Sequence, residues 1–115
     1  MICENLKVWQ DSFNMTAEIY ELLNNCRDFG FRDQLRRSSL SIPSNIAEGV
    51  ERGTDKDAVR FLYYAKGSAG EVFTQVRLGT RFGYIDKIQA ERLEKQCIQI
   101  SKMLTALIKY RQNIS

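Results

Sequence analysis

Apolar residues recur in steps of three and four through most of this chain, which is the spacing of one face of an α-helix. The pattern covers four stretches, residues 6–24, 32–50, 55–82 and 87–110. In the last two stretches the steps alternate regularly, as in helices that pack at the shallow angle of a bundle. The two seams are Ala58, Leu62, Ala65, Ala69, Val72, Val76 and Gly79, and then Ala90, Leu93, Cys97, Ile100, Leu104 and Leu107. Because short connections make successive helices antiparallel, the sequence predicts a single-domain, all-α, up-and-down antiparallel four-helix bundle over residues 1–115.

Local signals place several helix ends. Thr54, followed three residues later by Asp57, predicts the start of the third helix, and Asp86 with Gln89 predicts the start of the fourth. Gly83 predicts a left-handed residue just after the third helix. The boundaries of the two long helices are therefore set by residues that satisfy free backbone groups.

The second predicted helix contains Pro43 near its middle, and Gly30 punctuates the segment before it. Proline lacks an N–H and clashes with the carbonyl four residues earlier, so the helix is expected to kink or split here. Ser41, Ser44 and Asn45 are candidates to satisfy the freed backbone groups.

Composition narrows the class of function. Apolar residues make up 43% and charged residues 27% of the chain, as in ordinary globular proteins. There is no run of 18 apolar residues and no signal-peptide pattern at the start, so a cytoplasmic protein without a membrane span is expected. The three cysteines lack metal-finger spacing, and Cys97 is interpreted as a core residue. Histidine is absent, and with no phosphate-binding loop either, we expect no enzyme, no catalytic residue, no metal and no cofactor.

The third helix is apolar well beyond its seam. Its apolar arc spans roughly 200°, whereas packing inside a bundle needs about 100° or somewhat more. Either the second helix covers the excess, or another subunit does. The candidate oligomer-interface residues are Phe61, Tyr64, Phe73 and Leu78.

Two carboxylates, Glu48 and Glu71, are predicted near buried surface, and Glu71 lies inside the apolar stripe. A buried carboxylate without a partner is very costly. Both are therefore expected to contact an arginine or the serine and asparagine groups around Pro43, with a structural role. Arg36 or Arg37 is the expected partner.

Charge is distributed unevenly. Residues 1–30 carry a net charge of −3, and the remainder carries +6.

On the outer face of the third helix, arginines alternate with Gly67 and Gly70. Because glycine is unfavourable inside a helix, these two glycines suggest that another helix or a phosphate backbone approaches closely. Candidate nucleic-acid-binding residues are Arg52, Lys56, Arg60, Arg77 and Arg81. Only one aromatic, Tyr63, is interleaved with them, so binding is expected to be electrostatic, weak and tolerant of sequence. A line of lysines on the fourth helix is interpreted as a solvated face: Lys95, Lys102 and Lys109.

Several segments resemble one protein family. They are Leu6-Lys7-Val8-Trp9-Gln10, Gln34-Leu35-Arg36-Arg37, Ser41-Ile42-Pro43-Ser44-Asn45-Ile46-Ala47-Glu48-Gly49, Arg60-Phe61-Leu62-Tyr63-Tyr64-Ala65-Lys66-Gly67-Ser68, Glu71 and Gly83-Tyr84-Ile85. From about residue 5 to 110 the chain resembles the four-helix-bundle proteins encoded within intervening sequences of bacterial large-subunit ribosomal RNA.

The resemblance implies a bacterial, cytoplasmic protein that forms a homopentameric barrel. It makes motif residues of Pro43, Asn45, Glu48, Ser68 and Glu71. Related bundles, the accessory variability proteins of diversity-generating retroelements, are basic pentamers that bind a reverse transcriptase and nucleic acid. The chain departs from the family pattern at Ser38-Ser39, where alanines are common, and at Phe73, where a glutamate is common.

Taken together, these features predict a non-enzymatic, oligomeric helical bundle that acts as a binding or scaffold module. Its expected partner is RNA, DNA or a nucleic-acid-processing protein such as a reverse transcriptase. The alternative is a protein–protein adaptor that makes no contact with nucleic acid.

Overall fold

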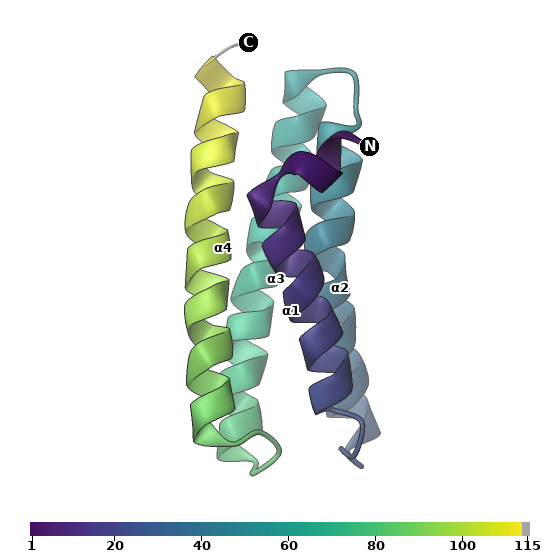
Figure 1. The fold of residues 1–115 in the computed structure, drawn as a ribbon, viewed down its shortest axis with the longest axis vertical. Helices are drawn as coiled ribbons and strands as arrows, with labels where there is room; N and C mark the ends of the chain where they lie inside the picture. The colour runs from purple at the N-terminus through teal and green to yellow at the C-terminus, as the bar shows by residue number, and fades with distance from the viewer. Residues whose placement is uncertain (114–115) are drawn as a thin grey trace.

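A computed structural model describes residues 1–113 and contains four long helices side by side (Figure 1). They are α1 (Lys7–Leu22), α2 (Phe29–Val50), α3 (Asp55–Arg81) and α4 (Lys87–Asn113), preceded by a short 3-10 helix, η1 (Ile2–Asn5). Successive helices are antiparallel, and none of the residues described is in a β-strand. The predicted all-α, antiparallel four-helix bundle is confirmed.

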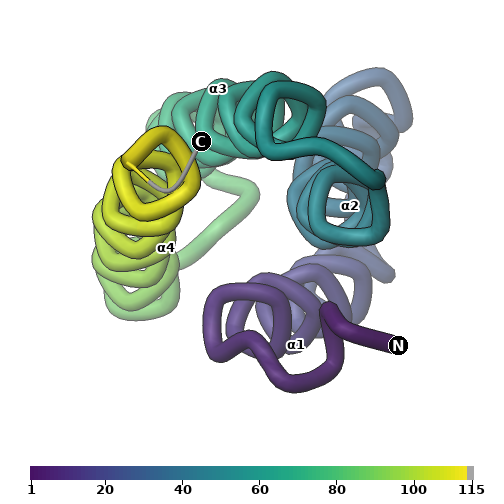
Figure 2. The backbone as a smooth tube through the Cα atoms, turned by 90° about the horizontal axis from the view of Figure 1, so that it is seen from above, coloured from purple at the N-terminus to yellow at the C-terminus, as the bar shows by residue number. Residues whose placement is uncertain are grey.

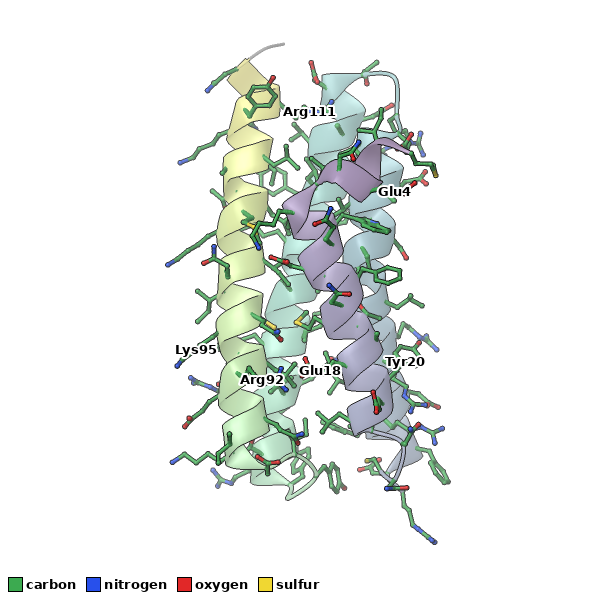
Figure 3. The ribbon with its side chains drawn as sticks, viewed as in Figure 1. Glu4, Glu18, Tyr20, Arg92, Lys95 and Arg111 are labelled. Carbon is green, nitrogen blue, oxygen red and sulfur yellow. The ribbon has the colours of Figure 1, made fainter. Side chains whose placement is uncertain are left out.

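The helices follow one another around the bundle in chain order (Figure 2). α3 packs extensively against both α2 and α4, whereas α1 packs mainly against α2 and more sparsely against α4. An ion pair between Arg92 and Glu18 joins this sparse α1–α4 seam, and their two labelled side chains meet between the helices (Figure 3). α3 therefore makes the most extensive contacts with the other helices, and α1 makes the least extensive ones.

The core is the apolar seam that the sequence predicts. Every predicted seam residue of α3 is buried, and so are those of α4 except Leu107, which is half-buried while Ile108 takes the inner position. Cys97 lies in this core with its Sγ 3.9 Å from the Sδ of Met15. Burial raises the pKa of the Cys97 thiol to about 12, so it is a neutral packing group at ordinary pH.

The predicted ends of the long helices are confirmed. The Thr54 side chain accepts a hydrogen bond from the Asp57 N–H at 3.2 Å, and the Asp86 side chain accepts one from the Gln89 N–H at 2.9 Å. Gly83 follows α3 with a φ of 81°, the left-handed conformation that glycine adopts without strain.

Other boundaries differ from the prediction, and α4 continues to Asn113 instead of ending near residue 110. α2 begins at Phe29 instead of residue 32, because Asp28 caps it by accepting a hydrogen bond from the Phe31 N–H at 3.1 Å. Gly30 thus lies in the first helical turn and does not interrupt the chain. The η1 turn over Ile2–Asn5 was not predicted, and α1 ends at Leu22.

Pro43 does not split α2, which is continuous from Phe29 to Val50. The carbonyl of Ser39, which would normally accept from residue 43, accepts instead from the Thr16 hydroxyl of α1 at 2.9 Å. The expectation that Ser41, Ser44 and Asn45 satisfy this group was therefore wrong. The compensating donor comes from a neighbouring helix.

Candidate interaction surfaces

Two kinds of feature are absent from the part of the chain that the structure describes. Between residues 1 and 113, no three histidine, cysteine or acidic side chains are grouped to hold a metal ion. In the same residues, none of the helices is both long and apolar enough to cross a membrane. The remaining candidates for an interaction site are the surface hollows and the exposed side chains.

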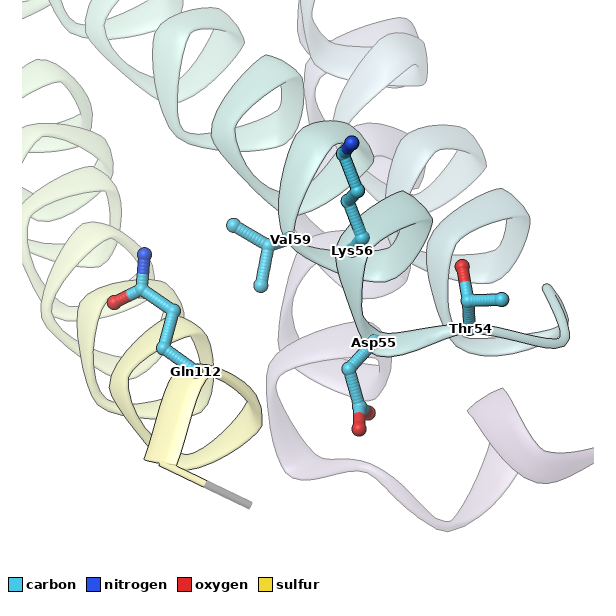
Figure 4. A pocket seen from close by; sticks show the side chains of 5 residues that line it. All are labelled: Thr54, Asp55, Lys56, Val59 and Gln112. Atoms are coloured by element: carbon cyan, nitrogen blue, oxygen red, sulfur yellow. The ribbon is translucent and has the colours of Figure 1, made fainter. Parts of the chain in front are cut away.

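A hollow of about 490 Å³ lies where α3 begins and α4 ends (Figure 4). It is lined by Thr54, Asp55, Lys56, Val59 and Gln112. Helix N-termini attract anions, but Asp55 and Asp57 already place carboxylates in this first turn. Arg111 also pairs with Asp55 at 2.9 Å. The charge of this hollow is thus balanced within the chain, and nothing in it selects a ligand.

The structure divides the predicted basic residues between two places. Arg52, Lys56 and Arg60 lie around the α2–α3 connection. Arg77 is 17 positions further along α3 than Arg60, about 25 Å along the helix axis at ~1.5 Å per residue. It turns toward α4, where it pairs with Glu94. Arg81 ends α3. The five residues do not form one patch.

Two members of the first group, Arg52 and Arg60, flank the aromatic ring of Phe61. The guanidinium carbons of Arg52 and Arg60 lie 4.7 and 4.9 Å from the centroid of this ring, and Tyr64 meets it edge-on at 5.6 Å. Arg52 also pairs with Glu48 at 2.7 Å, and Arg60 approaches Asp57 at 3.7 Å. We call Arg52, Lys56, Arg60, Phe61 and Tyr64 the arginine–aromatic patch.

Phe61 is held by the close approach of α2. A Cβ built on Gly49 would lie 3.0 Å from the Ala58 carbonyl oxygen and 3.1 Å from the Phe61 Cβ. Gly49 is therefore required for α2 and α3 to approach so closely. It leaves the Phe61 ring half-buried while the neighbouring Tyr64 stays 52% exposed.

The four predicted interface residues do not share one environment. Phe73 is partly buried on the α4 side, with the Arg77 guanidinium 4.9 Å from its ring centroid. Phe61 is half-buried on the other side, whereas Tyr64 and Leu78 are exposed. Phe82, also exposed, extends the Tyr64–Leu78 line toward the end of α3. The excess apolar arc is thus partly covered within the chain and partly open.

Most motif residues around Pro43 join α2 to α3 or stabilise α2. The hydroxyl oxygens of Ser41 and Ser68 are 2.6 Å apart across the two helices. Asn45 donates from its side chain to the Ser41 carbonyl at 2.8 Å. Pro43 itself is buried. These contacts contribute to the packing of α2 on α3 and to the backbone of α2.

The predictions for the two carboxylates were only partly right, since Glu48 pairs with an arginine but neither carboxylate pairs with Arg36 or Arg37. Glu71 is exposed, and no hydrogen bond or ion pair to it is present within residues 1–113. Glu48 is also exposed and pairs with Arg52, which lies just after the end of α2. The stripe that holds Glu71 faces solvent, since Tyr64 and Leu78 on either side of it along α3 are exposed as well. No buried charge therefore needs compensation there.

Arg36 has a different structural role from the one predicted. It donates to the carbonyl oxygen of Tyr20 at 2.7 Å and to the side chain of Asn24 at 3.2 Å. Its guanidinium also lies 4.9 Å from the centroid of the Tyr20 ring. Arg36 thus binds the C-terminal turn of α1, where the helix dipole favours a cation. Arg37 is exposed on the outside of α2.

An aromatic cluster at the opposite end of the bundle was missed from the sequence. The rings of Phe31, Phe82 and Tyr84 lie within 6 Å of one another, and Tyr84 donates from its hydroxyl to Asp28 at 2.8 Å. The sequence nevertheless contains a signal for this cluster. Antiparallel helices bring the first and third connections to the same end, and aromatic residues flank both Gly30 and Gly83.

Comparison with known proteins gives one family and several similar solved structures. A family model described as 23S rRNA-intervening sequence protein matches residues 4–106. A crystal structure from Bacteroides thetaiotaomicron, described as a protein of unknown function from the S23 ribosomal protein family, superposes with a TM-score of 0.83. It is 29% identical, and the match covers 89% of this chain and 98% of that one. No curated protein matches.

Proposed function

Because this chain belongs to the family of 23S rRNA-intervening sequence proteins, we propose that it is a non-enzymatic helical scaffold that binds RNA as a homo-oligomer. The observation that carries this proposal is the arginine–aromatic patch. Two guanidinium groups flank one half-buried ring there, with an exposed tyrosine beside them.

The chemistry of this patch suits RNA. Arginine and lysine bind phosphates and release counterions, while exposed aromatic faces and guanidinium planes stack on unpaired bases. The contacts of Arg52 with Glu48 and of Arg60 with Asp57 are partly exposed, and such pairs contribute about 0–1 kcal/mol. They weaken RNA binding without preventing it. We therefore expect weak affinity and little sequence preference.

The oligomeric part of the proposal rests on the open apolar line of Leu78 and Phe82 at the C-terminal end of α3, which the exposed Glu71 separates from the Tyr64 of the arginine–aromatic patch. A second subunit would remove this line from water, and a closed ring, most simply the pentamer implied by the family resemblance, would repeat the patch in every subunit. Repetition turns later contacts into intramolecular ones, which raises the overall affinity of a weak site. Light scattering after size exclusion measures the assembly, and a monomer at micromolar concentration would contradict this part.

The RNA test compares two triple variants of equal charge change. Arg52→Gln/Lys56→Gln/Arg60→Gln removes the cations of the patch, and Lys95→Gln/Lys102→Gln/Lys109→Gln removes three from α4. Fluorescence anisotropy with a labelled structured RNA should show binding that weakens steeply between about 50 and 200 mM salt. The first variant should lose most of this binding and the second little. Equal losses would show that only net charge matters.

Absence of RNA binding at low salt would favour the alternative, a protein–protein adaptor without nucleic-acid contact. That function would use the same exposed side chains, with Tyr64, Leu78 and Phe82 as anchors for a protein partner.

A further inference from the structure

We infer that the outer groove between α3 and α4 is a docking site for one helix of a partner protein, an amphipathic helix with acidic flanks. The inference rests on the proposed role as a binding module. It assigns that module a second face, distinct from the arginine–aromatic patch.

The first observation is that two glycines of α3 have no structural cause within the chain. Gly67 and Gly70 are exposed in the middle of the helix, and a Cβ built on either would meet no neighbouring atom within 4 Å. Neither has a positive φ. Alanine would fit both positions and would favour the helix, yet the backbone is left bare. A bare helix backbone permits unusually close approach by a second helix.

The second observation is an apolar groove beside Gly70. This groove, of about 260 Å³, is lined by Lys66, Ala69, Gly70, Phe73, Cys97, Ile98 and Ser101. Its floor is core, since Ala69 and Cys97 are buried, and Ile98 on its α4 edge is 46% exposed. The groove is therefore a shallow slot into which an apolar side chain of a partner fits.

The third observation is the charge around the slot. Lys66 lines it, and Lys95 and Lys102 flank Ile98 at the i−3 and i+4 positions, one helical turn to each side. Lys95 projects outward from α4 (Figure 3). Residues 58–70 of α3 and 95–109 of α4 contain no aspartate or glutamate, although the exposed Glu71 follows Gly70 directly and lies one helical turn after Gly67. Glu94, the nearest acid before that stretch, is paired with Arg77.

Together these features select the occupant. An apolar slot with a cationic rim complements a helix whose apolar anchors, spaced by three or four residues, are flanked by carboxylates. RNA phosphates would use the lysines but would gain nothing from burying Ile98 and Phe73. A second copy of this chain offers α1 as its acidic helix, but Asp11 and Glu18 are paired with Lys7 and Arg92, which leaves only Glu21 among the acids of α1 without an ion pair in the described residues.

The experiment uses a designed helical peptide as the probe, with leucines at three- and four-residue spacing and glutamates on both flanks. A control peptide carries lysine in place of every glutamate. In ¹⁵N NMR spectra of the full chain, the acidic peptide should shift the amide signals of Gly67, Gly70 and Ile98, and the control peptide should not. Equal shifts with both peptides, or none with the acidic peptide at millimolar concentration, would overturn the inference.

Variants then test the groove itself. Gly70→Leu fills the slot and should weaken peptide binding by at least about tenfold, the loss typical of a central interface position. Ser44→Leu, an equally exposed change on the outer face of α2, should leave binding unaltered. Lys66→Gln/Lys95→Gln/Lys102→Gln should weaken peptide binding but not RNA binding. An unchanged affinity of Gly70→Leu would refute the docking site.

Two further outcomes reassign the groove and thereby reject the inference. If Gly70→Leu changes the molar mass measured by light scattering, the groove is a contact between subunits. If an RNA oligonucleotide shifts the same glycine signals, it is an RNA site. Loss of RNA binding in the Arg52→Gln/Lys56→Gln/Arg60→Gln variant reports separately on the proposed function, so the two ideas fail independently.

Discussion

The hydroxyl of Thr16 lies 2.9 Å from the carbonyl oxygen of Ser39, the acceptor that Pro43 leaves without a backbone donor. Both residues are buried, so water does not replace this bond. The same hydroxyl is 2.9 Å from the carbonyl of Ser12, one turn earlier in α1, and its single proton is shared between the two acceptors. The proline defect of α2 is thus repaired by α1.

Thr16→Val should therefore destabilise the protein by about 1–3 kcal/mol, the cost of leaving a buried polar group unpaired. Urea unfolding followed by circular dichroism measures the loss. Thr74→Val removes a similar side-chain bond to the carbonyl four residues earlier, but at an exposed site, and should cost much less. In a Pro43→Ala background, where the backbone N–H returns to Ser39, Thr16→Val should be clearly milder. An equal cost in both backgrounds would contradict this account.

Glycine-to-alanine changes should have opposite effects at different sites. Gly67→Ala and Gly70→Ala should each stabilise the chain by up to about 1 kcal/mol, since the added methyl group meets nothing and alanine favours the helix. Gly49→Ala should destabilise it by about 1–3 kcal/mol, because its methyl group would press on the Ala58 backbone. Thermal unfolding tests both. A stabilised Gly49→Ala would show that α2 and α3 separate easily.

The cap of α2 should make stability depend on pH. The Phe31 N–H, and then the Tyr84 hydroxyl, lower the pKa of Asp28. Since the pKa is lower in the folded state, this contribution is present above the unfolded pKa and is lost as pH falls through the folded pKa. Hydrogen bonding to Asp28 raises the pKa of Tyr84, so that contribution is lost as pH rises through the folded pKa of the phenol, above its usual 10.

Tyr84→Phe separates these two effects. It should move the Asp28 pKa, measured by NMR titration, back toward 3.8, and it should remove the Tyr84 part of the alkaline loss of stability. Asp28→Asn keeps a capping side chain and should retain most of the helix start. An unchanged Asp28 titration in Tyr84→Phe would show that the Phe31 N–H alone sets the shift.

Adjacent arginines on α2 should differ in importance. Arg36→Ala loses the bonds to the Tyr20 carbonyl and to Asn24 and should cost about 1–2 kcal/mol. Arg37→Ala, one residue away and exposed, should change the free energy of unfolding by less than about 0.5 kcal/mol. Paired urea titrations compare them directly. Equal losses would point to a general charge effect.

The sequence by itself determined the bundle, its antiparallel order, the buried seams of α3 and α4 and the caps at Thr54 and Asp86. These follow from periodicity and from backbone groups satisfied within one turn, which are local properties of the chain. It also indicated that no local property of the helix favours glycine at positions 67 and 70, because glycine is unfavourable in any helix interior.

Only the tertiary structure decided which helix supplies the hydrogen-bond partner of a given polar group. No pattern within α2 indicates that Thr16 of α1 supplies the donor to Ser39, or that Arg36 binds the end of α1 instead of a carboxylate. Helix rotation also decided that Glu71 faces water and that Arg77 turns toward Glu94 of α4, whereas the separation of the basic residues along α3 follows from their positions in the sequence. Such pairings depend on the rotation and register of neighbouring helices, which packing of the whole core fixes and which periodicity leaves open.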